Sequence, residues 1–340
     1  MINFPTTIRS MRKSNSDMLL TFDQISEITV GALTISQTAE GIRFYKCTRE
    51  QLNAYPAELA RFVPRALATT GVRLDFHTDS RKLCLTFAER SKVEILIDGL
   101  LRYCRKSEPH EEAEFDLENA REKRVTVNLG CHGPAQVLEQ VGLDDGATLS
   151  RHKFDSRMLF IGDSITQGWN SEHDTAAWAY KVSAFFNAES VIQGVGGDFF
   201  RPENIVPLPF DPDTVILQLG TNDYTNFTDR ADFLRRMDEY MDRFTALYRT
   251  KQVFVLTPTR RFDDAPRPAG DFASFRQLIA DKAEQMGFSV IDGFTLLPPL
   301  REYYTDDIHP NECGFAIMAE SVIRQMIKAL KGVSHEYDKL

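Results

Sequence analysis

Hydrophobic and polar residues alternate along most of the chain between Leu20 and Leu149. A period of two places every second side chain on one face of a β-strand, so each short run predicts a strand that buries one face. Turn-type clusters separate the runs about every 8–12 residues, which is typical of an antiparallel sandwich or jelly roll. The predicted strands are 71–78, 81–87, 92–99, 100–104, 113–118 and 123–130.

Two local patterns add detail to this first half. A tight hairpin is expected around Asp98 and Gly99, because an Asp-Gly pair between alternating runs is a strong turn signal. Residues 48–62 interrupt the strands and predict one short helix. Thr48 and Gln51 have the spacing of a capping box at its start, although the segment also contains a proline.

The pattern changes near residues 150–156, after which apolar runs alternate with segments of helical period. Strands that alternate with helices form a parallel sheet with helices on both faces. We therefore predict an all-β, jelly-roll-like domain over residues 1–152 and an α/β domain over residues 153–340. The second domain's predicted strands are 158–164, 189–197, 213–220, 251–259 and 288–294, and its helices are 176–187, 229–250, 271–287 and 311–330.

Composition and charge narrow the class of protein. A chain of 340 residues exceeds the size at which a single core stops growing, about 250–300 residues, which agrees with two domains. The net charge of −9, with acidic and basic residues interspersed, argues against a nucleic acid or an anionic membrane as partner. The oligomeric state is left open.

The cysteines and the N-terminus bear on location and cofactors. Five scattered cysteines without metal-ligand spacing predict reduced thiols, and we expect neither a metal nor a cofactor. The first twenty residues lack the apolar core and cleavage site of a signal peptide, and no run of about 18 apolar residues exists. A cytoplasmic protein is therefore expected.

The first candidate catalytic residue is Ser164, which follows the apolar run 158–161 and precedes a helical pattern. Open α/β sheets bind ligands outside the carboxyl ends of their strands, where backbone N–H groups also face the ligand. A serine hydroxyl needs a base, and His309 can take its proton. Asp306, three residues earlier, can orient the imidazole, with Asp307 as a less favoured competitor. Pro310 is expected to start the last helix.

A developing oxyanion needs hydrogen-bond donors, and other predicted strand ends supply them. Candidates are the backbone N–H of Ser164, the N–H of Gly197 and the side-chain amide of Asn222. Gly196 competes with Gly197 for this role. Asp163 and Asp223 are expected to tie loops together through hydrogen bonds.

The blocks that hold these residues resemble those of the SGNH or GDSL hydrolases. They are GDSI at 162–165, the glycine at 197, GTND at 220–223 and DDIHP at 306–310. The resemblance implies a flavodoxin-like three-layer α/β/α fold, a Ser164–His309–Asp306 triad, and Gly197 and Asn222 as oxyanion donors. With a β-sandwich ahead of this domain, the chain is similar to two-domain carbohydrate esterases of the acetylxylan-esterase type, which have an N-terminal jelly roll.

The resemblance implies a serine esterase that removes short acyl groups, foremost acetyl, from a small acylated carbohydrate or oligosaccharide. Two alternatives stay open: a lysophospholipase or thioesterase acting on longer acyl chains, and a carbohydrate-binding protein with little turnover. The segment 296–300 is either a wall of the acyl pocket or a packed loop. The loop aromatics form either a sugar platform or ordinary packing; they are Trp169, Phe199, Phe200, Tyr224, Tyr303 and Tyr304.

Overall fold

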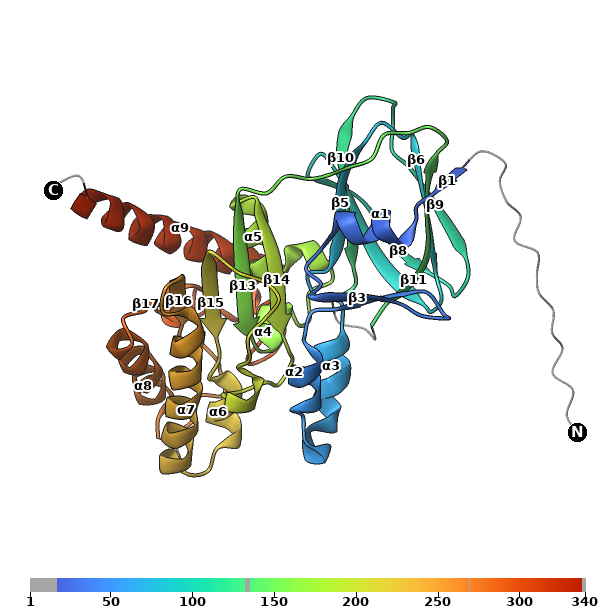
Figure 1. Cartoon of the computed structure of the whole chain (residues 1–340). Coiled ribbons are helices and arrows are strands. Elements are labelled where there is room, and N and C mark those ends of the chain that lie inside the picture. Colours follow the sequence, from blue (N-terminus) through green and yellow to red (C-terminus); the bar gives the residue numbers. More distant parts are fainter. Residues whose placement is uncertain (1–16, 132–134, 269, 338–340) are drawn as a thin grey trace, which may run out of the picture.

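The protein is described by a computed structural model that covers residues 17–131, 135–268 and 270–337. Two bodies lie side by side in Figure 1, a β-sandwich and a sheet flanked by helices. Both expected fold types are therefore confirmed. The chain passes between them after β12 (Ser150–Arg151), which pairs with the sandwich, and before β13 (Ser156–Gly162), which belongs to the parallel sheet.

The sandwich consists of two six-stranded sheets whose strands pair antiparallel. One sheet has the order β3-β4-β11-β6-β9, with β1 beside β11, and the other has the order β12-β5-β10-β7-β8, with β2 beside β5. Alternate side chains from both sheets fill the space between them, as the period of two predicts; Leu74, Phe76, Leu85 and Val127 are fully buried there. The remaining elements are β1 (Asp17–Leu19), α1 (Phe22–Ile28), β2 (Thr29–Val30), β3 (Thr34–Gln37), β4 (Ile42–Tyr45), β5 (Arg73–Thr78), β6 (Lys82–Phe87), β7 (Ser91–Ile97), β8 (Leu100–Ser107), β9 (Glu112–Asp116), β10 (Lys123–Leu129) and β11 (Val137–Asp144).

The hairpin prediction at Asp98 and Gly99 is confirmed, since both residues have positive φ and join β7 to β8.

The single helix predicted over 48–62 is wrong. The segment forms α2 (Arg49–Asn53), the 3₁₀ helix η1 (Ala57–Phe62) and α3 (Val63–Leu67). The break lies at Pro56, because a proline disfavours helical backbone in the residue before it. The capping box of Thr48 and Gln51 does open α2.

The C-terminal sheet has five parallel strands in the order β14-β13-β15-β16-β17. Counted from β13, this order is 2-1-3-4-5, the flavodoxin-like arrangement, and its direction switches between β13 and β15. Ligands bind outside the carboxyl ends of strands at such a switch point. The other strands are β14 (Ala188–Gly194), β15 (Thr214–Gln218), β16 (Gln252–Leu256) and β17 (Ser289–Ile291).

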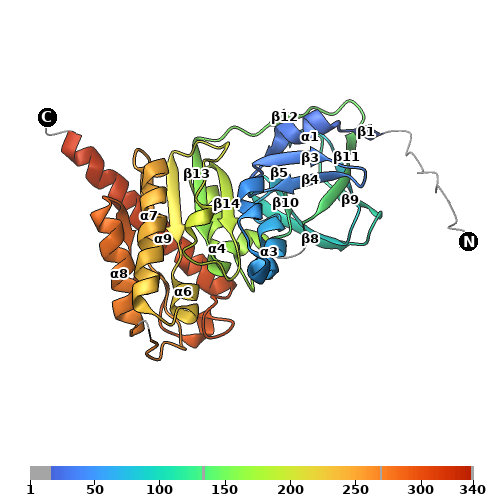
Figure 2. The ribbon, with the colours of Figure 1, turned by 60° about the horizontal axis from the view of Figure 1, so that its bottom comes forward.

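Helices cover both faces of this sheet, as Figure 2 shows. One face packs against α7 and α8, and the other against α5 and α9. The prediction that Pro310 starts the last helix is wrong. That helix begins at Glu312, and the Asn311 side chain accepts a hydrogen bond from the Gly314 N–H in its first turn. The bounds are α4 (Ser164–Gln167), η2 (Asp174–Ala176), α5 (Trp178–Phe185), η3 (Pro202–Asn204), α6 (Thr221–Asn226), α7 (Arg230–Tyr248), α8 (Phe272–Gln285), η4 (Gly293–Thr295), η5 (Arg301–Tyr303) and α9 (Glu312–Tyr337).

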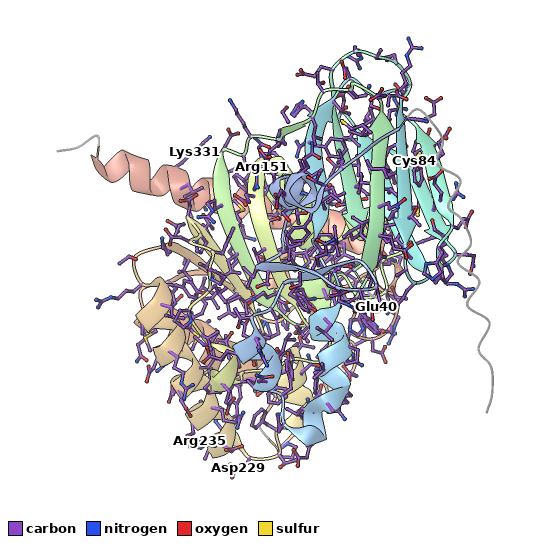
Figure 3. The ribbon with its side chains drawn as sticks, turned by 45° about the vertical axis from the view of Figure 1, so that its right-hand side comes forward. Glu40, Cys84, Arg151, Asp229, Arg235 and Lys331 are labelled. Atoms are coloured by element: carbon purple, nitrogen blue, oxygen red, sulfur yellow. The ribbon has the colours of Figure 1, made fainter. Side chains whose placement is uncertain are left out.

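Polar contacts join the two bodies. Arg151, which lies where they meet in Figure 3, forms an ion pair with Glu189 of β14 at 2.7 Å. Arg73 of β5 donates hydrogen bonds to the Ser190 hydroxyl and to the Ala188 carbonyl. The sandwich is therefore fixed against the edge strand β14 of the parallel sheet. Within the described part of the chain, none of the helices is both long and apolar enough to span a membrane.

Candidate active site

Ser164 lies at the carboxyl end of β13, as its sequence position predicts. Asp163 caps the short helix α4, its carboxylate accepting a hydrogen bond from the Ile165 N–H, so Ser164 is the first residue of that helix. Helix α4 can lie directly against the end of the neighbouring strand β14, because Gly194 there has no side chain. A Cβ there would lie 2.3 Å from the Gln167 backbone nitrogen. The serine is largely buried, with 6% of its surface exposed.

His309 lies within hydrogen-bond reach of the serine, although the two are 145 residues apart in the chain. Ser164 Oγ and His309 Nε2 are 2.8 Å apart. On the other side of the ring, His309 Nδ1 is 2.8 Å from Asp306 Oδ2. With the proton on Nδ1 held by the carboxylate, Nε2 is free to accept from the serine hydroxyl. The three predicted residues thus form one hydrogen-bonded chain.

Asp306, and not Asp307, is the carboxylate of this chain. Partial burial raises the pKa of Asp306, but hydrogen bonds from the His309 and Ile308 N–H groups and from the imidazole outweigh it, so the net pKa lies below its usual value. Asp306 is therefore ionised at neutral pH. Asp307 instead forms an ion pair with Arg301 at 2.7 Å. Of the two aspartates, Asp306 is therefore the one that lies beside the His309 ring.

The loop after β14 carries the predicted glycines. The Gly196 N–H donates to the Gln167 side-chain carbonyl at 2.7 Å, so Gly196 is occupied in holding the loop to α4. Gly197 has a φ of +87°, a region that suits glycine. A Cβ on Gly197 would lie 2.6 Å from Phe62 Cε1 and 2.9 Å from Arg65 Nη1. Gly197 is thus the better candidate donor of the pair.

Asn222 lies in the first turn of α6, at the carboxyl end of β15. Its side-chain amide donates to the Asp198 carbonyl at 2.9 Å, which fixes the direction of the side chain and brings it beside the Gly197 loop. Strands β13, β14 and β15 are neighbours in the sheet, so their carboxyl ends bring the candidate donors to the edge that carries Ser164. Ser164 and Asn222 therefore lie in the first turns of helices, and Gly197 on a loop, at the same edge of the sheet, where His309 and Asp306 reach Ser164.

Buried carboxyl groups support these loops from below, as expected for Asp163 and Asp223. Asp223 accepts a hydrogen bond from the Phe200 N–H, and Asp198 pairs with Arg201 at 2.8 Å. Burial raises the pKa of Asp163 to about 7 and that of Asp223 to about 8. Near neutral pH the carboxyl groups of Asp163 and Asp223 therefore carry a proton part of the time. They hold loops and do not reach the Ser164–His309 pair through any hydrogen bond in the described residues.

Sequence analysis missed a set of N-terminal residues that hold the end of β14 and the loop after it. The Lys46 ammonium is fully buried and donates to the Gly194 carbonyl at 2.8 Å, and burial lowers its pKa to about 8. Gln51 exchanges hydrogen bonds with the Gln193 side chain. Arg65 donates to the Gly196 carbonyl at 2.5 Å. Figure 1 shows α2 and α3 beside α4, and Figure 2 shows α3 beside α4 from another side.

The loop aromatics divide between core and rim. Phe200 and Tyr224 are fully buried in the core, and Tyr304 packs edge-on against Phe262, so a sugar platform made of all six is wrong. In the segment 296–300, Leu296 and Leu297 belong to the core, whereas Leu300 is 50% exposed. Trp169 and Phe199 do lie beside the candidate site: Trp169 contacts Arg65, and Phe199 contacts Phe62.

A cleft of about 540 Å³ opens beyond Phe199, between the α2–η1 segment and the helices α6 and α7. Its apolar wall consists of Ala54, Pro56, Leu59, Phe199 and Phe227, and its rim carries Arg201, Glu203, Asn226, Asp232 and Arg236. Because Phe199 is two residues from Gly197, the cleft adjoins the candidate oxyanion loop. Both domains contribute to its lining.

Comparison with known proteins identifies the type of domain. Residues 160–317 match the GDSL-like lipase/acylhydrolase family. No curated protein sequence is significantly similar to the chain.

Solved structures resemble 78–93% of the chain, at identities that establish the fold alone. A salicylyl-acyltransferase from a tetracycline biosynthetic pathway is 20% identical, with a TM-score of 0.74 over 88% of this chain and 94% of that one. A family 2 carbohydrate esterase from Myceliophthora fergusii is 17% identical, with a TM-score of 0.65 over 78% and 95%. An acetyl xylan esterase from the rumen bacterium Butyrivibrio proteoclasticus is 14% identical, with a TM-score of 0.64 over 93% and 98%.

Proposed function

We propose that the protein is a serine esterase that removes short acyl groups, foremost acetyl, from carbohydrates. The match of residues 160–317 to the GDSL-like lipase/acylhydrolase family supports an esterase or acyltransferase of this type. The observation that carries the proposal is the hydrogen-bonded chain from Ser164 through His309 to Asp306. The likeness of fold to carbohydrate esterases supports the substrate class.

Acylation starts when Ser164 Oγ attacks the ester carbonyl and His309 Nε2 takes the hydroxyl proton. Asp306 holds the imidazole in the tautomer that leaves Nε2 free and stabilises the imidazolium that forms. The negative charge of the tetrahedral intermediate moves to the former carbonyl oxygen. The Ser164 and Gly197 N–H groups and the Asn222 amide are the donors proposed for it.

Acylation ends when the C–O bond to the alcohol breaks as His309 gives its proton to the departing oxygen, leaving an acyl-Ser164 ester. In deacylation, a water molecule loses a proton to His309 and attacks that ester. His309 then returns the proton to Ser164 Oγ as the bond between the acyl carbon and Oγ breaks, which regenerates the serine and releases the carboxylic acid. If a second alcohol takes the place of water, the same steps transfer the acyl group, so the partition between products separates an esterase from an acyltransferase.

A second candidate, an acylhydrolase for longer chains, rests on the cleft beside Phe199. Its volume of about 540 Å³ lies within the 300–1,000 Å³ typical of ligand pockets, and one wall is apolar. A short acyl group would leave most of it for the alcohol, whereas a long chain would fill it. Rates on 4-nitrophenyl acetate and 4-nitrophenyl octanoate distinguish the two, and a preference for octanoate favours the longer chain.

The proposed function is tested by measuring acetate released from a panel of monoacetylated sugars and oligosaccharides. We expect turnover of at least one member by the parent protein and none by Ser164→Ala. Binding of the sugars without acetate release by the parent would refute the esterase and favour a carbohydrate-binding protein.

A further inference from the structure

The side chain of Arg65 lies against the candidate oxyanion loop although it comes from the N-terminal domain. Its Nη1 donates to the Gly196 carbonyl, and its Cζ lies 5.4 Å from the Trp169 ring centre and 5.8 Å from that of Phe62. Nη1 would also lie 2.9 Å from a Cβ placed on Gly197. The guanidinium is thus held between aromatic rings, directly beside the residue proposed to donate to the oxyanion.

The charge of Arg65 is not neutralised by a carboxylate within the described residues. Three other arginines near these loops do pair with carboxylates: Arg201 with Asp198, Arg261 with Asp263, and Arg301 with Asp307. A carbonyl can hold the side chain in place, but it does not cancel a full positive charge. Keeping an unpaired guanidinium half-buried costs desolvation energy, which an anion bound there would offset.

The guanidinium also carries more N–H donors than its hydrogen bond to the Gly196 carbonyl uses. It carries five N–H groups in a rigid fork, and its hydrogen bond within the described residues is the one to Gly196. Carboxylate and phosphate match that fork geometry, and stacking on aromatic rings leaves its edge available. Positioning the loop would need only one neutral donor, so that role alone does not account for an arginine.

We propose that Arg65 binds an anionic group of the substrate, a carboxylate or a phosphate, next to the ester that Ser164 attacks. The inference rests on the proposed esterase function and names its substrate class. Either part of the ester can carry the anion. On the alcohol side, this is an acylated uronic acid or sugar phosphate; on the acyl side, it is a half-ester of a dicarboxylic acid.

The test compares kcat/KM for two matched pairs of esters. One pair is a monoacetylated methyl glucuronoside and the corresponding methyl glucoside, which differ by a carboxylate on the alcohol. The other is 4-nitrophenyl hemisuccinate and 4-nitrophenyl butyrate, which differ by a carboxylate on the acyl chain. We expect the parent protein to favour the anionic member of one pair by about 10- to 100-fold, the range of a charge-assisted hydrogen bond.

Variants separate charge recognition from loop positioning. Arg65→Gln keeps an N–H donor for the Gly196 carbonyl but loses the charge, so it should lose the anionic preference; a mere positioning role would lower both members of a pair equally. Arg65→Lys should retain part of the preference. Arg61→Gln is the matched control, because Arg61 also contacts the Phe62 ring but is solvent-exposed. It should leave the preference unchanged.

The outcomes are distinct from those for the esterase itself. A parent protein that hydrolyses neutral esters but favours neither anionic partner refutes the role of Arg65 and leaves the esterase standing, as does a preference that survives in Arg65→Gln. If Arg65→Gln does not fold, the proposal is tested instead by measuring how the parent protein's preference for the anionic ester depends on ionic strength. The preference should shrink as salt increases, and a preference that does not respond to salt would overturn the proposal.

Discussion

Gly197→Ala tests whether the N-terminal domain shapes the candidate oxyanion loop. The substitution meets two obstacles. A non-glycine residue at a φ of +87° costs about 1–2 kcal/mol in the left-handed region. The new Cβ would also lie 2.6 Å from Phe62 Cε1, and Phe62 is only 2% exposed and cannot swing away into solvent. Overpacking of this kind costs about 1–3 kcal/mol, so we expect a total loss of about 2–5 kcal/mol in unfolding free energy.

Activity should fall as well, because relief of the clash moves the Gly197 N–H away from the oxyanion. Loss of one such donor lowers kcat by about 10²–10³-fold. Urea unfolding and initial rates on 4-nitrophenyl acetate measure the two effects. Gly146→Ala is the control, since Gly146 has a φ of +76° with open space where its Cβ would go. It should show the backbone cost alone and full activity.

A double-mutant cycle isolates the contact with Phe62. Phe62→Leu removes the ring atoms that face Gly197, so the double variant with Gly197→Ala should be more stable than the two single effects predict when added. For residues in direct contact we expect a coupling of about 0.5–3 kcal/mol. Additive effects, or Gly197→Ala with stability and kcat equal to those of Gly146→Ala, would show that Phe62 does not constrain the Gly197 loop.

Three further predictions concern the same loops. Asp306→Asn should lower kcat by up to roughly 10⁴-fold, because an amide no longer holds the His309 tautomer; parent-like rates would exclude Asp306 from the triad. Asn222→Ala should lower kcat by about 10²–10³-fold while costing only about 1 kcal/mol of stability, and a stability loss with unchanged kcat would make it structural. Burial raises the pKa of Asp223 from 3.8 to about 8, so the folded state binds an extra proton between those values and stability falls as pH rises. The unfolding free energy should fall by up to about 1.4 kcal/mol per pH unit for this one group. Asp223→Asn should make the fall between pH 5 and 8 less steep. An identical fall in both proteins would contradict the raised pKa of Asp223.

The sequence predicts the part of the site that depends on local structure. Ser164, Gly197 and Asn222 each follow an apolar strand, and parallel strands bring their carboxyl ends to one edge. Asp306 and His309 are three residues apart, so a single loop can place carboxylate and imidazole together. These placements follow from strand direction and short spacing, which periodicity and turn chemistry reveal.

The contacts that join the two domains could not be predicted from the sequence. Arg65 and Gly196 are 131 residues apart, and Lys46 and Gly194 are 148 apart. No period or motif relates such pairs, because they meet only through the docking of one domain on another. The broken helix at Pro56 has a local cause instead, because the proline that disfavours helical backbone before it stands in the sequence.

If Ser164 is the nucleophile of an ester-cleaving triad, mass spectrometry of the protein quenched during turnover of 4-nitrophenyl acetate should detect the acyl-enzyme. We expect one added acetyl group on the peptide that contains Ser164. The folded Ser164→Ala protein should carry no adduct and lose kcat/KM by at least roughly 10⁴-fold. Parent-like turnover by Ser164→Ala, or an acetyl group that accumulates on another residue in step with turnover, would show that Ser164 is not the nucleophile.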